Sequence, residues 1–593
     1  MTVVNKIRQA SKEAIEKLYA ISLEEKDVQV NQTKPEFEGD YTLVLFSFIK
    51  QLKKSPDQIG KEIGEYLLNN NPGIFSSFNI IKGFLNLVLK DTLWTEFLQH
   101  NHSDINYGRN KPTGRKVMVE YSSPNTNKPL HLGHLRNIFL GWGIAAIQKA
   151  NGCDVVKTCI VNDRGIHICK SMIAWKLFSN GATPESTGKK GDHFVGDYYI
   201  KFNTEHQQQV KELIEKGLGK EEAENQAPIM KDAQQMLFDW EAGKPEVIEL
   251  WKKMNKWVYE GFAITYQRIG SDFDKIYYES ETYLLGKDIV QKGLEKGVFI
   301  RKEDGSVWID LTADGLDEKI VQRKDGTSVY ITQDIGLVEQ KYNEYKPDES
   351  IYVVGDEQNY HFKVLKLIAQ KMKLQGADGI YHLNYGMVEL PSGKMKSREG
   401  TVVDADDMID EMVKEAEKKT LEQGKIKTED FSPEELAVLY EIVGLGGLKF
   451  FLLRVDPRKR MVFNPEESID LHGFTATFIQ YAHARIKSIL REEMPARATI
   501  IFDELLPLEK NLIVILEQYS AIISEAAEEH NPSVIAIYAF NVAQVFNSFY
   551  AKHKVLKAEA EEKKQLRLQL CEMTAHVIAS AMGLLGIQVP ERM

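Results

Sequence analysis

Cysteine is scarce in this chain, which has four cysteines in 593 residues and no CxxC pair. So few cysteines cannot form a disulfide framework, and we expect a reducing compartment. The first twenty residues lack the apolar core of a secretory signal, and the sequence contains no internal repeat and no low-complexity tract. These absences exclude a small secreted scaffold and a fibrous protein, and they favour a cytoplasmic location.

Positive charge is also in deficit, because 75 Lys and Arg stand against 86 Asp and Glu, which gives a net charge of −11. An acidic total argues against a protein that coats nucleic acid non-specifically, although a local basic face is still possible. The longest apolar stretch, residues 436–453, contains Glu441 and Lys449. We interpret it as a buried helix rather than a membrane span, so no membrane partner is predicted.

The pattern of apolar and polar residues predicts a multi-domain α/β protein with a small α+β domain at residues 1–110. Strand-like runs then alternate with helices over residues 111–405, the βαβ pattern of a Rossmann-type parallel sheet, with a charged helical insertion at about 180–265. A helical connector, 406–463, leads to an all-helical C-terminal domain, 464–593. The strand-like runs of the central domain are 117–121, 154–161, 297–301, 307–311, 328–332, 350–354 and 379–390.

The segment SSPNTNKPLHLGH, residues 122–134, follows a predicted strand and leads into a predicted helix. In a βαβ unit, the N terminus of such a helix offers free N–H groups and a positive dipole end at the carboxyl edge of the sheet, which suits an anion. His131 and His134 lie on the same side of the first turn and can donate to phosphate oxygens. Gly133 between them leaves room for a base to lie flat on the backbone.

Two plainer interpretations of this histidine pair stay open at this point. The histidines could be structural, or they could bind a metal ion together with Cys159, His167 and Cys169. Those three residues lie on and beyond the next predicted strand without any standard zinc spacing, so no metal site is predicted.

A second segment, SGKMKSREG at residues 392–400, is short, basic and flanked by glycine. Such a loop can bring cations over a polyphosphate and stabilise charge that develops in the transition state. Alone it is also typical of an ordinary basic surface loop. The combination of HLGH at the start of the sheet with KMKS near its end is far more specific.

Together these segments resemble the class I aminoacyl-tRNA synthetases, and VEYSSPNTNKPLHLGHLRN at residues 119–137 resembles the arginyl-tRNA synthetase version. Other stretches that resemble this family, in order along nearly the whole chain, are GDY at 39–41, GFLN at 83–86, GDHFVGDYY at 191–199, WEAGKPEV at 240–247, YYESETY at 277–283, DGTSVYITQD at 325–334, QYAHARI at 480–486 and LLGIQVPERM at 584–593.

The resemblance implies a two-step reaction. L-Arginine attacks the α-phosphate of ATP to give arginyl-adenylate and pyrophosphate, and the arginyl group then moves to the 2′-hydroxyl of the terminal adenosine of tRNA(Arg). Magnesium is implied as the partner of ATP. Such chemistry depends on positioning and charge stabilisation, so no covalent nucleophile is required. The resemblance also implies that residues 464–593 bind the anticodon and that residues 1–110 contact the outer corner of the tRNA; we expect a monomer.

The matching motifs imply roles for individual residues. Tyr330 and Asp334 would read the arginine side chain, because a guanidinium is a planar fork of donors that needs carboxylate and hydroxyl acceptors. The residues expected around arginine are Glu120, Ser123, Asn125, His134, Tyr330, Asp334 and Gln358. Those expected to bind ATP are His131, Gly133, His134, Lys394, Lys396, Ser397 and Arg398.

The basic loop departs from the common KMSKS pattern, because Ser397 stands where the second lysine is expected. In the family that this chain resembles, the lysine just before the histidine motif is thought to compensate, which here is Lys128. We therefore predict that Lys128 acts with His131, His134 and Lys394 in catalysis, with Lys396 and Arg398 as alternatives.

Two other classes of protein compete with a synthetase. A small-molecule nucleotidyltransferase with the same histidine motif would not need a long helical C-terminal domain. A non-catalytic RNA-binding paralogue would not need intact His131, His134, Asp334 and Gln358. An aminoacylation assay separates the three.

Overall fold

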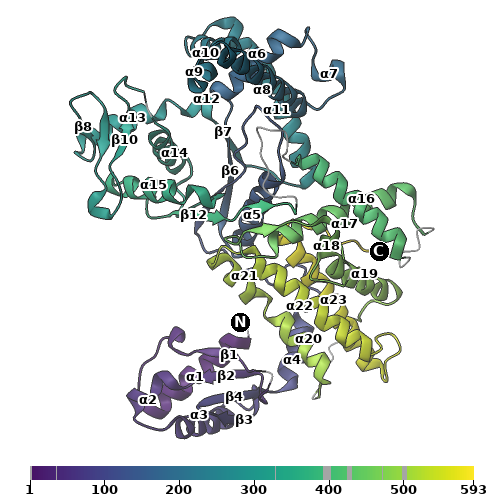
Figure 1. Ribbon diagram of the computed structural model, residues 1–593. Helices are drawn as coiled ribbons and strands as arrows, with labels where there is room; N and C mark the ends of the chain where they lie inside the picture. The colour runs from purple at the N-terminus through teal and green to yellow at the C-terminus, as the bar shows by residue number, and fades with distance from the viewer. Residues whose placement is uncertain are drawn as a thin grey trace.

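The structure is a computed structural model that describes residues 3–34, 36–327, 329–391, 403–423, 430–470, 472–496, 502 and 504–593. It confirms the predicted fold class: in chain order, a small N-terminal α+β domain precedes a parallel-sheet domain with a helical insertion, and a helical domain follows. In space the N-terminal domain lies against the C-terminal helices (Figure 1). The basic loop residues Lys394, Lys396, Ser397 and Arg398 lie outside the described residues.

The central sheet has five parallel strands in the order β12-β11-β5-β6-β7. Its strands are β5 (Lys116–Glu120), β6 (Asp154–Val161), β7 (Lys275–Tyr278), β11 (Glu349–Gly355) and β12 (Ile380–Tyr385). Helix α5 (Leu132–Ala150) connects β5 to β6 and is buried along most of its length. A Cβ at Gly141 would lie 2.2 Å from the Cβ of Tyr121, so only glycine lets α5 approach the end of β5 this closely.

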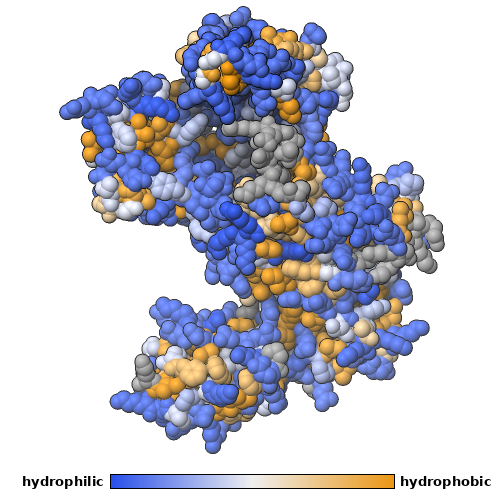
Figure 2. Space-filling view, in the orientation of Figure 1, coloured by the Kyte–Doolittle hydropathy of each residue, from blue (hydrophilic) through white to orange (hydrophobic). Residues whose placement is uncertain are grey.

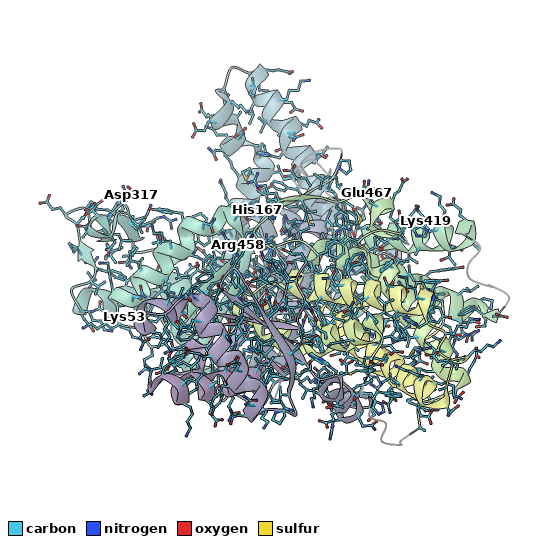
Figure 3. The ribbon with its side chains drawn as sticks, turned by 90° about the horizontal axis from the view of Figure 1, so that it is seen from below. Lys53, His167, Asp317, Lys419, Arg458 and Glu467 are labelled. Carbon is cyan, nitrogen blue, oxygen red and sulfur yellow. The ribbon has the colours of Figure 1, made fainter. Side chains whose placement is uncertain are left out.

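The insertion between β6 and β7 is entirely helical apart from its turns, as the charged sequence predicts. Its helices are α6 (Ile166–Phe178), α7 (Pro184–Thr187), α8 (Gly191–Glu215), α9 (Lys220–Gln226), α10 (Pro228–Glu241) and α11 (Pro245–Ile269). Helix α8 packs on both α6 and α11. In Figure 3 the insertion rises from the body of the molecule, with His167 of α6 at its base.

A second excursion, between β7 and β11, forms a small module that extends away from the sheet (Figure 1). It contains α12 (Glu279–Thr282), α13 (Leu285–Glu295), the antiparallel strands β8 (Ile300–Arg301), β9 (Val307–Ile309) and β10 (Lys319–Gln322), and α14 (Tyr330–Tyr345). Figure 3 shows Asp317 at the outer end of this module and Lys419 on the opposite side of the molecule.

The start of α14 corrects the prediction of a strand at residues 328–332. The run Val-Tyr-Ile-Thr has strand-like composition, but from Tyr330 onward it forms a helix whose buried side chains follow helical spacing, as in Ile331, Ile335 and Val338. These side chains pack into the core of the module. Tertiary packing therefore overrides local β propensity here.

The two ends of the chain form the remaining domains. The N-terminal domain has an antiparallel sheet, β1-β2-β4-β3, covered by helices, and the C-terminal domain is a helical bundle. The N-terminal elements are α1 (Val3–Tyr19), β1 (Val30–Gln32), β2 (Tyr41–Val44), α2 (Phe46–Leu52), α3 (Pro56–Asn70), β3 (Phe75–Ile81), β4 (Phe84–Leu89) and α4 (Asp91–Asn101), and the C-terminal helices are α19 (Ala476–Glu492), α20 (Pro507–Glu517), α21 (Tyr519–Glu528), α22 (Pro532–Lys552) and α23 (Glu561–Leu584). On the face drawn in Figure 2, hydrophilic residues predominate over the N-terminal domain and the insertion.

Two described helices, α17 (Pro433–Leu453) and α22, are long and apolar enough to cross a membrane by length and composition alone. Helix α17 packs against α16 (Ala405–Gln423), α19 and α5, and 67% of its most apolar window is buried in protein. Its Lys449 donates hydrogen bonds to the carbonyl oxygens of Ile269 and Gly586. The apolar stretch at 436–453 is therefore a buried helix, as predicted.

Candidate active site

The order of strands in the sheet reverses between β5 and β11. From β5 the chain proceeds outward to β6 and β7, and it then returns to the other side of β5 to add β11 and β12. In open α/β sheets, ligands bind beyond the carboxyl ends of the strands at such a switch point. The segment that follows β5 here is the predicted histidine segment, and β11 leads into a short helix, Asp356–Gln358.

Asn137 joins the elements that meet at this point. Its Oδ1 accepts a hydrogen bond from the backbone N–H of Ser122 (2.6 Å), and its Nδ2 donates to the carbonyl oxygen of Val353 in β11 (2.7 Å). Ser122 has a left-handed backbone with φ of 61°, and its hydroxyl bonds to that of Tyr266 in the insertion (2.7 Å). Asn137 was not among the predicted site residues, although it is the last residue of the family-like stretch at 119–137.

The two histidines cap α5 with their own rings. Nδ1 of His131 accepts the N–H of Gly133, and Nδ1 of His134 accepts the N–H of His131, both at 3.1 Å. Because each Nδ1 is an acceptor, a neutral ring carries its proton on Nε2. The ring centroids are 3.8 Å apart, and a Cβ at Gly133 would lie 3.0 Å from Cε1 of His131. Both rings are thus fixed with an N–H donor at Nε2, to which no hydrogen bond is seen from the described part of the chain.

Burial keeps both imidazoles neutral. It lowers the pKa of His131 to about 4, with a further lowering by the charge of Lys128. Burial also lowers the pKa of His134 well below its usual value, and the charges of His131 and Lys128 lower it further. Lys128 therefore lies close enough to the histidine pair to act on it electrostatically. The predicted catalytic role of Lys128 beside the histidines stays a prediction.

Ser123 and Asn125 lie in the loop between β5 and α5. Ser123 is exposed, and Asn125 is half-buried and forms a parallel bridge to Asn162 at the end of β6. Thr126 donates its N–H to the carbonyl oxygen of Asn162 (3.1 Å), so the loop is held by the neighbouring strand. Gln358 ends the short helix after β11 and is exposed.

Glu120, expected to accept the substrate guanidinium, already has a cationic partner. It is 8% exposed at the end of β5, and its Oε2 is bound by the buried ammonium group of Lys341 from α14. Tyr352 of β11 lies beside this pair, and Nζ of Lys341 is 5.0 Å from the centroid of its ring. Burial, followed by the charges of Glu120 and Asp334, raises the pKa of the Tyr352 hydroxyl, so this phenol lies near both carboxylates.

Asp334 and Tyr330 lie on the same side of the first turns of α14, four residues apart. The chain runs through α14 and then through β11 in the opposite direction, so this end of α14 is near the carboxyl edge of the sheet. Oδ2 of Asp334 lies 2.7 Å from Nε2 of His361 in α15 (Asn359–Lys371), and no described residue donates to its Oδ1. Tyr330 is 72% exposed.

A further carboxyl group faces the same region. Burial raises the pKa of Glu279, at the start of α12, and the nearby charges of Asp163 and Asp334 add to the rise while Arg164 opposes it. Asp163 fixes the neighbouring residue, because it accepts hydrogen bonds from the N–H and the hydroxyl of Ser280 (2.8 and 2.7 Å). Glu279 lies in the YYESETY motif but was not predicted as a site residue.

The alternative zinc ligands are engaged elsewhere. The thiol of Cys159 donates to the carbonyl oxygen of Ser122 (2.7 Å), and His167 contacts the hydroxyl of Tyr199 (3.0 Å). Burial raises the pKa of Cys169 to about 12, which disfavours the thiolate that zinc requires.

Comparison with known families agrees with this geometry. The catalytic domain of class I tRNA synthetases (R) matches residues 96–464, the DALR anticodon binding domain matches 479–593, and the arginyl-tRNA synthetase N-terminal domain matches 5–89. The chain belongs to the arginyl-tRNA synthetase family. The predicted resemblance is thereby confirmed.

Known arginine–tRNA ligases are similar to this chain over its full length or nearly so. The chain is 52% identical to the arginine–tRNA ligase of Bacteroides thetaiotaomicron over 100% of both chains, and 49% identical to that of Flavobacterium psychrophilum over 98% of both. Its fold is similar to that of the Thermus thermophilus arginyl-tRNA synthetase, with a TM-score of 0.79 at 22% identity over 99% of both chains.

Proposed function

We propose that this chain is an arginine–tRNA ligase that activates L-arginine with ATP and transfers it to the terminal adenosine of tRNA(Arg). The observation that carries the proposal is the capped imidazole pair at the N terminus of α5, at the switch point of a sheet in a chain related to arginine–tRNA ligases along its entire length.

In the first step, the start of α5 receives the phosphates of ATP. Nε2–H of His131 and of His134 are donors that need no charge, and the helix N terminus adds free N–H groups and a positive dipole end. Lys128 supplies a full positive charge, together with Lys394. Lys396, Ser397 and Arg398 are the further contacts proposed for the basic loop. Mg²⁺ enters as the counter-ion of the substrate ATP, and we assign it no ligand among the described residues.

Arginine is read by acceptors from the module. Asp334 presents Oδ1 to the guanidinium, with Glu279 as a second carboxyl group and Tyr330 as a hydroxyl acceptor. Glu120 acts mainly through its pair with Lys341, which fixes its Oε2 and leaves Oε1 to face the substrate. Ser123, Asn125, His134 and Gln358 hold the amino-acid head group.

The second step requires no covalent enzyme intermediate, because the 2′-hydroxyl of the tRNA attacks the carbonyl carbon of arginyl-adenylate directly and AMP leaves. We assign residues 464–593 to anticodon binding, 1–110 to the outer corner of the tRNA, 111–405 to catalysis and 406–463 to a connector. The enzyme is proposed to be a cytoplasmic monomer with no membrane partner.

Aminoacylation tests this function directly. Purified protein with ATP, labelled arginine and total tRNA is expected to give arginyl-tRNA, whereas labelled lysine is not. Pyrophosphate exchange is expected only when tRNA is present. Exchange without any charging of tRNA would favour a nucleotidyltransferase, and tRNA binding without either activity would favour a non-catalytic paralogue.

The histidine pair should show an unusual pH dependence. Folding lowers the pKa of His131 from about 6.5 to about 4. Between these values the unfolded chain binds more protons than the folded one, so stability falls as pH drops through this window and is fully present above it. NMR titration of the histidine Cε1–H signals should show no titration of His131 between about pH 5.5 and 8. A midpoint near 6.5 would contradict the proposed neutral donor.

A further inference from the structure

A second stretch of backbone lies against the histidine motif. Asp404 pairs with His131 in an isolated antiparallel bridge. The N–H of Leu132 donates to the carbonyl oxygen of Val403 (3.3 Å), and the N–H of Ala405 donates to that of Leu130 (3.0 Å). The backbone of His131 is therefore held from the side by residues 403–405, which lead into α16 and include its first residue.

The side chains of Asp404 and Asp406, at the start of α16, contact the helical insertion. Oδ2 of Asp406 accepts from Nζ of Lys190 (2.6 Å) and from Nε2 of His193 (3.0 Å), while its Oδ1 accepts from the hydroxyl of Thr265 (3.0 Å). Nε2 of His193 also lies 3.4 Å from Oδ2 of Asp404. Burial opposes ionisation of Asp406, but the hydrogen bonds from His193 and Lys190 outweigh it and lower its pKa. The contacts are thus charged and partly shielded from water.

The same helix contacts the other side of the histidine motif. A Cβ at Gly196 of α8 would lie 2.8 Å from Cδ of Pro129, the residue after Lys128. The first two turns of α8 therefore touch both segments that flank His131: residues 128–130 before it and 403–406 beside it. Helix α11 of the insertion adds a contact on one of these sides, because its Thr265 donates to Asp406.

A metal ion is the competing interpretation of this cluster. The ligand atoms of Asp192, His193 and Asp406 all lie within 4.8 Å of one another. However, the ammonium group of Lys190 lies 3.0 Å from Asp192 and 2.6 Å from Asp406, so a positive charge is already supplied between the two carboxylates. Direct ion pairing explains the arrangement without a metal.

We propose that Lys190, His193 and Asp406 are positioning residues that clamp residues 403–405 against His131 and thereby couple the helical insertion to the ATP site. They touch neither substrate nor the reacting atoms. The inference rests on the proposed role of His131 and His134 in binding ATP. A disturbance of α8 should therefore appear first in the use of ATP and only later in the use of arginine.

Substitution of Asp406 by Asn tests this coupling. Because small displacements of positioned groups have large effects, Asp406→Asn is expected to raise the KM for ATP about tenfold while the KM for arginine stays within about twofold. His193→Ala is expected to raise the KM for ATP as well. His193→Gln keeps a donor toward Asp406, so its KM for ATP should be much closer to that of the wild type. Asp197→Asn is the matched control, since Asp197 pairs with Lys189 on the exposed side of the same helix (2.5 Å) and should behave as wild type.

The outcomes separate this inference from the function on which it rests. An unchanged KM for ATP in Asp406→Asn and Lys190→Met would overturn the coupling. Equal rises in the KM for ATP and the KM for arginine would also overturn it, because they would indicate a general destabilisation of the fold. A metal ion retained by the wild-type protein and lost from Asp406→Asn would also overturn it. If His131→Ala leaves the KM for ATP unchanged, the proposed function of the histidine pair fails instead.

Discussion

Replacement of Asp334 by Asn is expected to lower kcat/KM for arginine by about 30- to 150-fold, which corresponds to about 2 to 3 kcal/mol. This is the lower part of the range measured when one partner of a hydrogen-bonded charge pair is removed. Asp334 is partly exposed, with 40% of its side chain accessible, which places the effect at that end of the range. Asparagine keeps the shape and one acceptor oxygen but loses the charge that a guanidinium requires. Steady-state aminoacylation at varied arginine concentration measures the change.

The loss should be specific for arginine. The KM for ATP should stay close to that of the wild type, since Asp334 lies in the module rather than at α5. Asp288→Asn is a suitable control, because Asp288 is an exposed acid on α13 of the same module. A variant Asp334→Asn that keeps wild-type kcat/KM for arginine would remove this residue from the site. A small further loss is expected from Glu279→Gln.

The parts of the site that lie on one continuous stretch of sequence could be predicted from the sequence. The strand at 116–120, the loop and α5 all follow from an apolar run, a proline-bearing segment and a helix ended by Asn151 and Gly152. The position of the histidines at the helix start follows as well, because local spacing determines it.

Contacts between distant segments could not be predicted in this way. No local pattern indicates that Lys341 binds Glu120, since the two are 221 residues apart, or that Asp406 meets Lys190 across 216 residues. The composition of 328–332 favoured a strand because Val, Tyr, Ile and Thr suit a pleated surface, yet helical packing of the module determined the outcome. Motif resemblance supplied Tyr330 and Asp334, but the sequence did not place them on one helix.

Removal of the Lys128 charge should reduce adenylate formation about 100-fold, because one direct charge contact in the transition state is worth about 3 kcal/mol. Lys128 is close enough to lower the pKa of both His131 and His134 after burial. An anion held by the two Nε2–H groups therefore lies within the field of this lysine. Single-turnover formation of arginyl-adenylate, with tRNA present, measures the effect of Lys128→Ala.

The same variant gives an independent signature at the histidines. Loss of a neighbouring positive charge favours the protonated ring, so the pKa of His131 should rise from about 4 toward its ordinary value, with burial still holding it below about 6.5. Lys149→Ala, at the far end of α5, is the matched control, because it removes an exposed lysine from the same helix. If Lys128→Ala shifts the histidine pKa but forms adenylate at the normal rate, then Lys128 is a neighbour of the imidazoles without being a ligand of the phosphates. Cations of the basic loop, such as Lys396 or Arg398, would then carry that role.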